Sequence, residues 1–118
     1  MKIFRFDTET GENTDRYGSS GLIVSRVAQL FEEAFVNCAY LSPGGIIGHH
    51  QAAAPQLFLV VQGDGWVRAE TSDPISIKVG QAAYWESGEW HESGTEFGMT
   101  AIIIEGTNFD PAKLMPPV

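Results

Sequence analysis

Two stretches in the middle of the chain decide what it folds into. Residues 44–65 read GGIIGHHQAAAPQLFLVVQGDG, and residues 80–91 read GQAAYWESGEWH. The first stretch places two histidines before the apolar run Leu57–Val61 and closes on a Gly-Asp-Gly segment. The second begins at a glycine and ends at the third histidine of the chain, His91. Short apolar runs bounded by glycines in this way are typical of strands separated by turns.

Similar runs surround these two stretches. The sequence predicts strands at 57–62, 66–71, 75–79, 82–86 and 99–105. The glycines of 63–65 predict a tight hairpin, and Ser72-Asp73-Pro74 predicts a further turn. In 75–79 the alternation is strict, which places Ile75, Ile77 and Val79 together on a buried face. The pattern favours an all-β sandwich or barrel.

The flanking segments give weaker signals. Residues 35–41 alternate and stop at Pro43-Gly44-Gly45, which predicts a strand, although apolar residues from 23 to 35 also fit the spacing of a helix. Residues 8–20 are polar and glycine-rich and predict a loop. The tail at 110–118 holds three prolines and is expected to lie along the surface rather than in a sheet.

The composition limits the class of protein. The 118 residues carry 7 basic and 15 acidic side chains, a net charge of −8, and are expected to form one domain over 1–118. The basic residues are scattered, which argues against a nucleic-acid partner. No apolar run approaches the length of a membrane span, and the N-terminus has no signal-peptide pattern, so we expect a cytoplasmic protein. The lone Cys38 excludes an intrachain disulfide and is expected to be a small core residue.

The three histidines fall in two places about forty residues apart, at His49, His50 and His91. Two strand ends of a small barrel can bring such segments to one site. Imidazoles bind transition metals, and sites of this kind combine two or three histidines with an oxygen ligand. The spacing alone is weak evidence for a metal, because histidines at polar surface positions fit it as well. The alternative for the same residues is a polar pocket that hydrogen-bonds an organic ligand.

The two central stretches resemble the two motifs of the cupin superfamily. Residues 44–65 resemble the motif G-x5-H-x-H-x3,4-E-x6-G, and residues 80–95 resemble the motif G-x5-P-x-G-x2-H-x3-N. The resemblance implies a small all-β cupin barrel, a double-stranded β-helix or jelly roll. It specifies function much less, since this fold serves enzymes as well as binding and sensing domains.

Carried over position by position, the resemblance implies a reduced metal site. The ligands it implies are His50, Gln56 and His91, with His49 and Gln51 as possible substitutes. The acidic ligand of the motif falls on Gln56, and one of its two paired histidines is missing. An amide brings a dipole where a carboxylate brings a charge, so the affinity for Zn, Ni, Fe or Mn is expected to be weakened.

Aromatic and acidic residues surround these positions. The residues expected to line the pocket are Tyr40, Phe58, Trp85 and Trp90. Glu89 and Glu92 flank His91 and are expected either to accept a hydrogen bond from its ring N–H and orient it, or to raise its pKa. Acids at the pocket mouth would favour a cationic or neutral substrate over a phosphorylated one.

These sequence features are compatible with three functions. The first is a metal-dependent enzyme acting on a small molecule, and the second is a non-catalytic module that binds or senses a small molecule without metal. The third is a structural barrel whose surface binds a protein, which a filled interior would favour. A homodimer is expected in each case, formed through an exposed N-terminal strand, Lys2–Phe6.

Overall fold

The computed structural model describes residues 1–118 and contains ten strands and three short 3-10 helices. The strands are β1 (Lys2–Arg5), β2 (Glu12–Thr14), β3 (Leu22–Val24), β4 (Ala34–Leu41), β5 (Ile46–Gln51), β6 (Gln56–Ala69), β7 (Ile75–Lys78), β8 (Gln81–Trp85), β9 (Trp90–Gly94) and β10 (Met99–Gly106). The 3-10 helices are η1 (Thr8–Thr10), η2 (Arg16–Gly18) and η3 (Pro111–Lys113). No helix has the length and apolar character needed to cross a bilayer.

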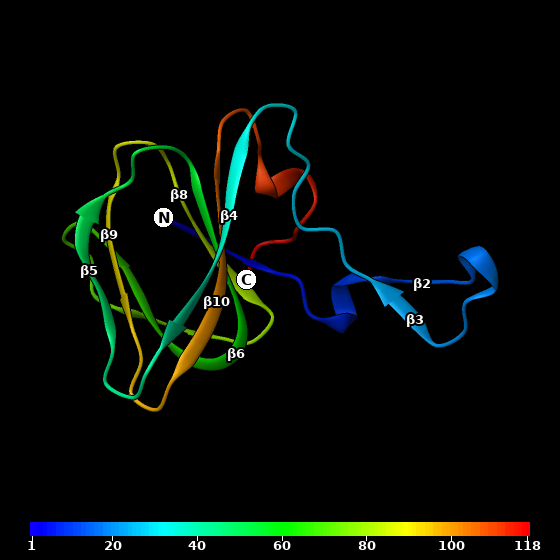
Figure 1. The fold of residues 1–118 in the computed structure, drawn as a ribbon, viewed down its shortest axis with the longest axis horizontal. Helices are drawn as coiled ribbons and strands as arrows, with labels where there is room; N and C mark the ends of the chain where they lie inside the picture. Colours follow the sequence, from blue (N-terminus) through cyan, green and yellow to red (C-terminus); the bar gives the residue numbers. More distant parts are fainter.

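The strands form an antiparallel jelly-roll barrel, as the sequence predicts (Figure 1). One sheet has the order β1-β8-β6-β10-β4. On the other side, β7 and β9 pair with the second half of β6, and β5 pairs with β9. The long strand β6 therefore belongs to both sheets and connects them.

The predicted hairpin at 63–65 is wrong, because β6 runs through these residues as one 14-residue strand. Gly63 has a φ of 75°, and here the strand bends from one sheet into the other. A side chain at Gly63 would collide with the backbone of Gly98, and one at Gly65 would collide with the backbone of Gly94. The glycines thus serve close approach between strands at a bend, not a turn.

Two apolar clusters cover the two faces of the first sheet. The barrel interior is filled by Phe58, Val60, Val67, Ile77, Ala83, Trp85, Met99 and Ala101. The outer cluster consists of Phe4, Leu57, Leu59, Ala82, Ile104, Phe109 and Met115. The prediction for the proline-rich tail is corrected in part, because Phe109 and Met115 are buried in the outer cluster and Pro117 bridges to Phe4 at the edge of β1.

Two expectations about burial are corrected. Cys38 is exposed, because β4 is the edge strand of its sheet and nothing covers this part of it. Of the three apolar residues at 75–79 only Ile77 is buried, because Ile75 begins β7 and Val79 follows its last residue, both outside the barrel wall.

The N-terminal strand is not free to pair with another chain. β1 pairs with β8 on one edge, and its other edge holds the tail through Arg5 N–H to Pro116 O and Val118 N–H to Ile3 O, both 3.0 Å. The expected dimer contact through Lys2–Phe6 is therefore wrong, since both edges of this strand are used within the chain.

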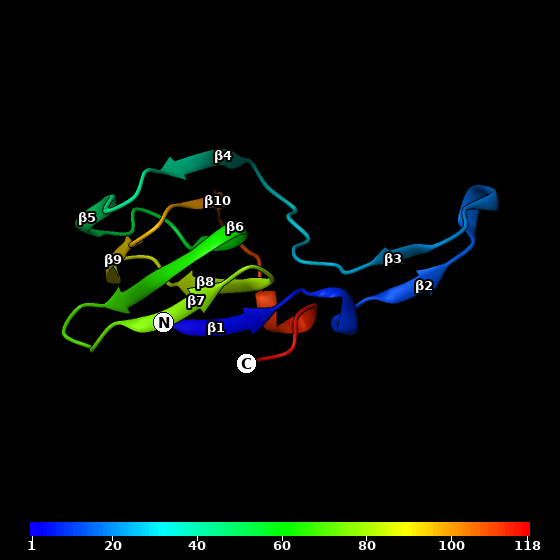
Figure 2. The same ribbon diagram turned by 90° about the horizontal axis from the view of Figure 1, so that it is seen from below.

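Residues 8–27 form an arm that projects from the barrel (Figures 1 and 2). Its centre is the two-stranded sheet of β2 and β3. The loop predicted at 8–20 thus contains a strand and two 3-10 turns. Residues 25–33 form neither helix nor strand, so the alternative of a helix over 23–35 is wrong, and the predicted strand at 35–41 is present as β4.

Candidate functional site

Two histidines lie side by side at one end of the barrel. His50 on β5 and His91 on β9 are directly opposite each other in the antiparallel pair. Their rings are 4.3 Å apart between centroids and inclined by 54°. His91 is only 2% exposed, whereas His50 is exposed and its Nδ1 lies 2.6 Å from the carbonyl oxygen of Gly48. The pair thus has one ring inside the barrel and one at its rim.

Trp85 covers the other side of the buried histidine. It lies at the end of β8, and its indole stacks on His91 at a centroid distance of 4.5 Å and an interplanar angle of 28°. Phe58 meets Trp85 edge-on at 6.1 Å. Gln56, which is 5% exposed, is the register partner of Trp85 on the neighbouring strand β6. A row of polar and aromatic side chains therefore crosses the interior from His50 to Gln56.

Two polar atoms in this row have no hydrogen-bond partner. They are Nε1 of Trp85 and Nε2 of His91, and both are buried. Buried polar atoms without a partner cost of the order of 1–3 kcal/mol and are rare in folded proteins. Because the two rings are stacked, both atoms belong to one small region of the interior.

The contact of Nδ1 determines which ring nitrogen of His91 carries the proton. Nδ1 lies 3.3 Å from the backbone oxygen of Glu89, which can only accept, so Nδ1 carries the proton. Burial lowers the pKa of His91, and the nearby His50 lowers it further, against the opposing effect of Glu89 and Glu105. The ring is therefore neutral near pH 7, with Nε2 as an acceptor beside the Trp85 donor.

The acidic residues around His91 have other partners. The carboxylate of Glu89 accepts from the amino group of Met1 at 2.5 Å and from the Glu86 N–H. Glu92 forms an ion pair with Arg68 at 2.6 Å. The expectation that a carboxylate of Glu89 or Glu92 orients His91 is corrected, because the backbone oxygen of Glu89 takes that position.

The remaining candidates lie outside the interior. His49 stacks on Trp90 at 5.0 Å, and the Gln51 amide donates to the Gly88 oxygen at 2.8 Å. Tyr40 is 78% exposed on the edge strand, so its assignment to the pocket is corrected. The sequence pattern could not place it, because a two-residue period leaves open which face of β4 is inside.

The donor set does not fit a resident metal ion. Only two imidazoles lie together, and no group of three or more His, Cys, Asp and Glu side chains converges anywhere in the chain. Gln56 supplies a neutral amide where the cupin motif has a carboxylate, and the Trp85 indole occupies one side of His91. A dication would therefore receive two neutral nitrogens and no negative charge from these residues.

Comparison with solved structures identifies the class of protein: the chain has the cupin fold. A cupin superfamily protein from Desulfitobacterium hafniense superposes with a TM-score of 0.60 at 10% identity, over 76% of this chain and 82% of that one. A double-stranded β-helix protein from Klebsiella pneumoniae gives 0.58 at 17% identity, over 78% and 85%. No protein-family profile and no curated protein matches the sequence.

Some structural neighbours carry descriptions of enzymes, among them DMSP lyases. Another is a predicted oxalate decarboxylase from Thermotoga maritima, with a TM-score of 0.54 and 19% identity, over 58% of this chain. The chain spans 62% of the length of that protein. These likenesses define the fold, and the chemistry of the site determines the function.

Proposed function

We propose that the chain is a small-molecule binding domain in which a neutral organic ligand contacts His91, Trp85 and Gln56, without a resident metal. The observation that carries this proposal is the pair of buried, unpartnered atoms, a Trp85 N–H donor beside a His91 acceptor. A ligand group with an adjacent acceptor and donor, such as a primary amide or a lactam, satisfies both. The stacked aromatic rings supply the apolar wall that such sites need.

The surroundings favour a neutral ligand. His91 is neutral, and the carboxylates of Glu89 and Glu92 already have partners. Glu105, the register partner of Gln56, forms no ion pair and acts on the His91 ring, which disfavours an anionic ligand. His50, at the rim beside His91, is placed to contact a ligand at the entrance. We also retain the proposals of a homodimer and a cytoplasmic location, the latter because of the single unpaired cysteine.

Thermal shift and calorimetric titration test this proposal. We expect small amides and lactams such as benzamide and 2-pyrrolidinone to raise the melting temperature, because a ligand bound only by the folded chain stabilises it. Trp85→Phe keeps the aromatic packing and removes the donor, and should weaken binding by roughly tenfold, the value of one hydrogen bond. Trp90→Phe, at the exposed rim, is the matched control.

The competing enzyme hypothesis predicts the opposite response. If zinc or nickel raises the melting temperature, amides do not, and His91→Ala abolishes the metal effect, the binding proposal is overturned in favour of a metal site. If neither class of ligand has an effect, the interior is a packed core and the third function, a structural barrel, is favoured.

A further inference from the structure

The arm has an apolar surface with no partner in the chain. Leu22, Ile23 and Val24 form the whole of β3 and are each about two-fifths exposed, and Tyr17 at the tip is almost completely exposed. An isolated two-stranded hairpin of this size is marginally stable in water. The arm is therefore a structure that another surface would stabilise.

The base of the arm is held to the barrel by hydrogen bonds. Ser25 donates to the Asp7 oxygen at 3.0 Å, and Thr10 donates to the same oxygen at 2.8 Å. Beyond the arm, Val27 and Leu30 pack against the outer apolar cluster. Both ends of the arm are thus held, and its apolar strand points away from the molecule (Figure 2).

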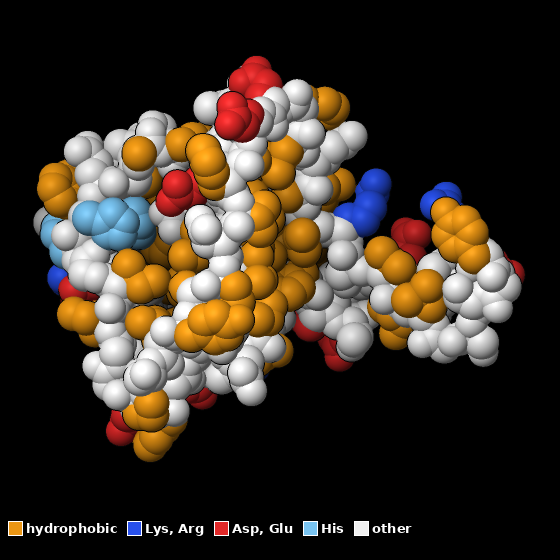
Figure 3. All heavy atoms as spheres, in the orientation of Figure 1, with side chains coloured by type: hydrophobic (Ala, Val, Ile, Leu, Met, Phe, Trp, Pro, Cys, Tyr) orange, Lys and Arg blue, Asp and Glu red, His pale blue; other side chains and the backbone are white.

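The barrel carries a second unpartnered surface along β4. This eight-residue strand pairs only with β10, so its other edge presents free N–H and C=O groups. Val36 and Cys38 share a face with Ile104 and Ile102, their partners on β10, on the outside of the sheet. Val36 is 62% exposed, and Figure 3 shows hydrophobic side chains gathered over this strand.

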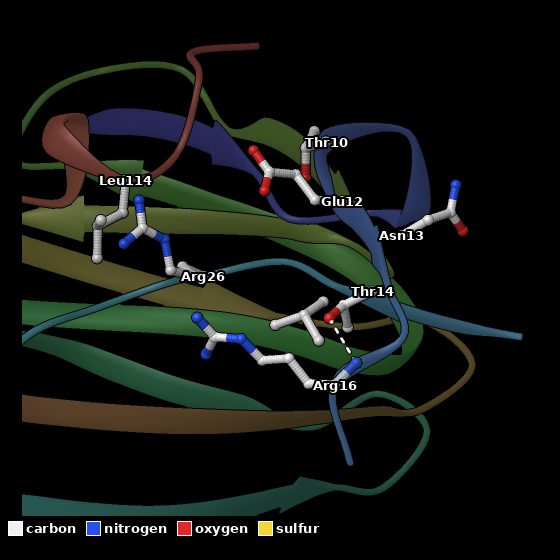
Figure 4. A pocket seen from close by; sticks show the side chains of 8 residues that line it. Thr10, Glu12, Asn13, Thr14, Arg16, Arg26 and Leu114 are labelled. Atoms are coloured by element: carbon white, nitrogen blue, oxygen red, sulfur yellow. Dashed lines mark hydrogen bonds between the residues drawn. The ribbon is translucent and has the colours of Figure 1, made fainter. Parts of the chain in front are cut away.

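Charges match between the two surfaces. Arg16 and Arg26 of the arm form no ion pair and extend into a cavity of about 530 Å³ at the arm, lined also by Glu12, Val24 and Leu114 (Figure 4). Glu33 directly precedes β4 and forms no ion pair within the chain.

We propose that the β2–β3 arm of one copy docks along β4 of a second copy, and the reverse, so that two arms are exchanged in a symmetric homodimer. A second copy fits both surfaces, because each chain carries one arm and one open edge, and a twofold arrangement satisfies the two together. The apolar strand β3 covers Val36 and Tyr40, and the arm arginines meet Glu33 at the start of β4. This inference rests on the homodimer proposed above and names its surface.

Cross-linking through Cys38 tests the contact, since it is the single cysteine of the chain and lies on β4. Leu22→Cys and Ile23→Cys place a thiol on opposite faces of the arm. Under mild oxidation we expect at least one of them to give a disulfide-linked dimer that disappears when Cys38→Ser is added. Phe97→Cys, in the more exposed turn between β9 and β10, is the control and should not exceed the wild-type level of cross-linked dimer.

Light scattering distinguishes the arm exchange from a dimer that forms through another surface. Leu22→Asp and Val36→Asp should each raise the dimer dissociation constant at least tenfold, and Phe97→Asp should not. A wild-type chain that is monomeric at micromolar concentration overturns both the dimer and the arm exchange. A dimer that survives both substitutions, with no cross-link from the arm, keeps the dimer and overturns the arm exchange.

Discussion

A methyl group added at Gly63 would meet the backbone of Gly98, and the φ of 75° at Gly63 is one that L-residues rarely adopt. We therefore expect Gly63→Ala to lower the free energy of unfolding by at least about 2 kcal/mol, from backbone strain and the displaced neighbouring strand. Gly48→Ala is the matched control, because nothing lies within 4 Å of a side chain there. Urea denaturation measures both, and equal stability of the two variants would contradict the role assigned to Gly63.

His91 gives the protein a pH-dependent stability. Burial lowers its pKa in the folded chain below the ordinary value of 6.5, so below pH 6.5 the unfolded chain binds a proton that the folded chain does not. Stability should therefore fall as the pH drops below about 6.5, by no more than about 1.4 kcal/mol per pH unit from this residue.

The contribution of His91 is isolated by substitution. In His91→Gln the difference in unfolding free energy between pH 8 and pH 5.5 should shrink, whereas His49→Gln, whose ring is exposed, should retain the wild-type difference. If the two variants behave alike, the pH dependence arises elsewhere.

Among the elements, the C-terminal tail has the clearest energetic role. Met115 follows η3, is 2% exposed and packs in the outer cluster with Phe4 and Leu59. Met115→Ala should cost about 2–4 kcal/mol of stability, because it leaves a cavity under the tail. Val118→Ala, at an exposed position, should be neutral within about 0.5 kcal/mol. Thermal unfolding of the two variants checks the expectation, and a neutral Met115→Ala would show that the tail is dispensable.

The sequence predicts the strands well where one face is buried, and less well where the chain changes sheets. Strands β7, β8 and β10 are predictable because their apolar residues alternate with polar ones or run between clear turn residues. The Gly63–Gly65 segment resembles a hairpin, since local sequence cannot distinguish a turn from a bend forced by contact with residues 94 and 98. The β2–β3 arm could not be predicted, because two strands of three residues each are too short to show an alternating pattern.

The candidate site is predictable to a similar degree. Strand parity favours His50 over His49 as the partner of His91, and the structure places those two rings together. The stacking of Trp85 on His91 and its unpartnered Nε1 are beyond the reach of sequence, because β8 and β9 meet there only through tertiary packing. The hydrogen bond between His91 and the backbone oxygen of Glu89 could not be predicted either, because sequence patterns concern side chains and not carbonyl groups.

For the molecule as a whole, repulsion between negative charges lowers the stability of the folded chain, and added salt should weaken this repulsion. The net charge is −8, and only four ion pairs form within the chain, so most carboxylates repel one another without compensation. At pH 8, raising the NaCl concentration from about 10 mM to about 150 mM shortens the screening length from roughly 30 Å to 8 Å. At low salt the screening length is similar to the 47 × 33 × 23 Å dimensions of the molecule, so carboxylates repel one another across it. Because added salt screens this repulsion, we expect the melting temperature to rise by a few degrees. Sucrose at matched osmolarity is the control for non-ionic effects. A melting temperature that falls with added salt would mean that attractive ion pairs, within a copy or between two copies, outweigh the repulsion.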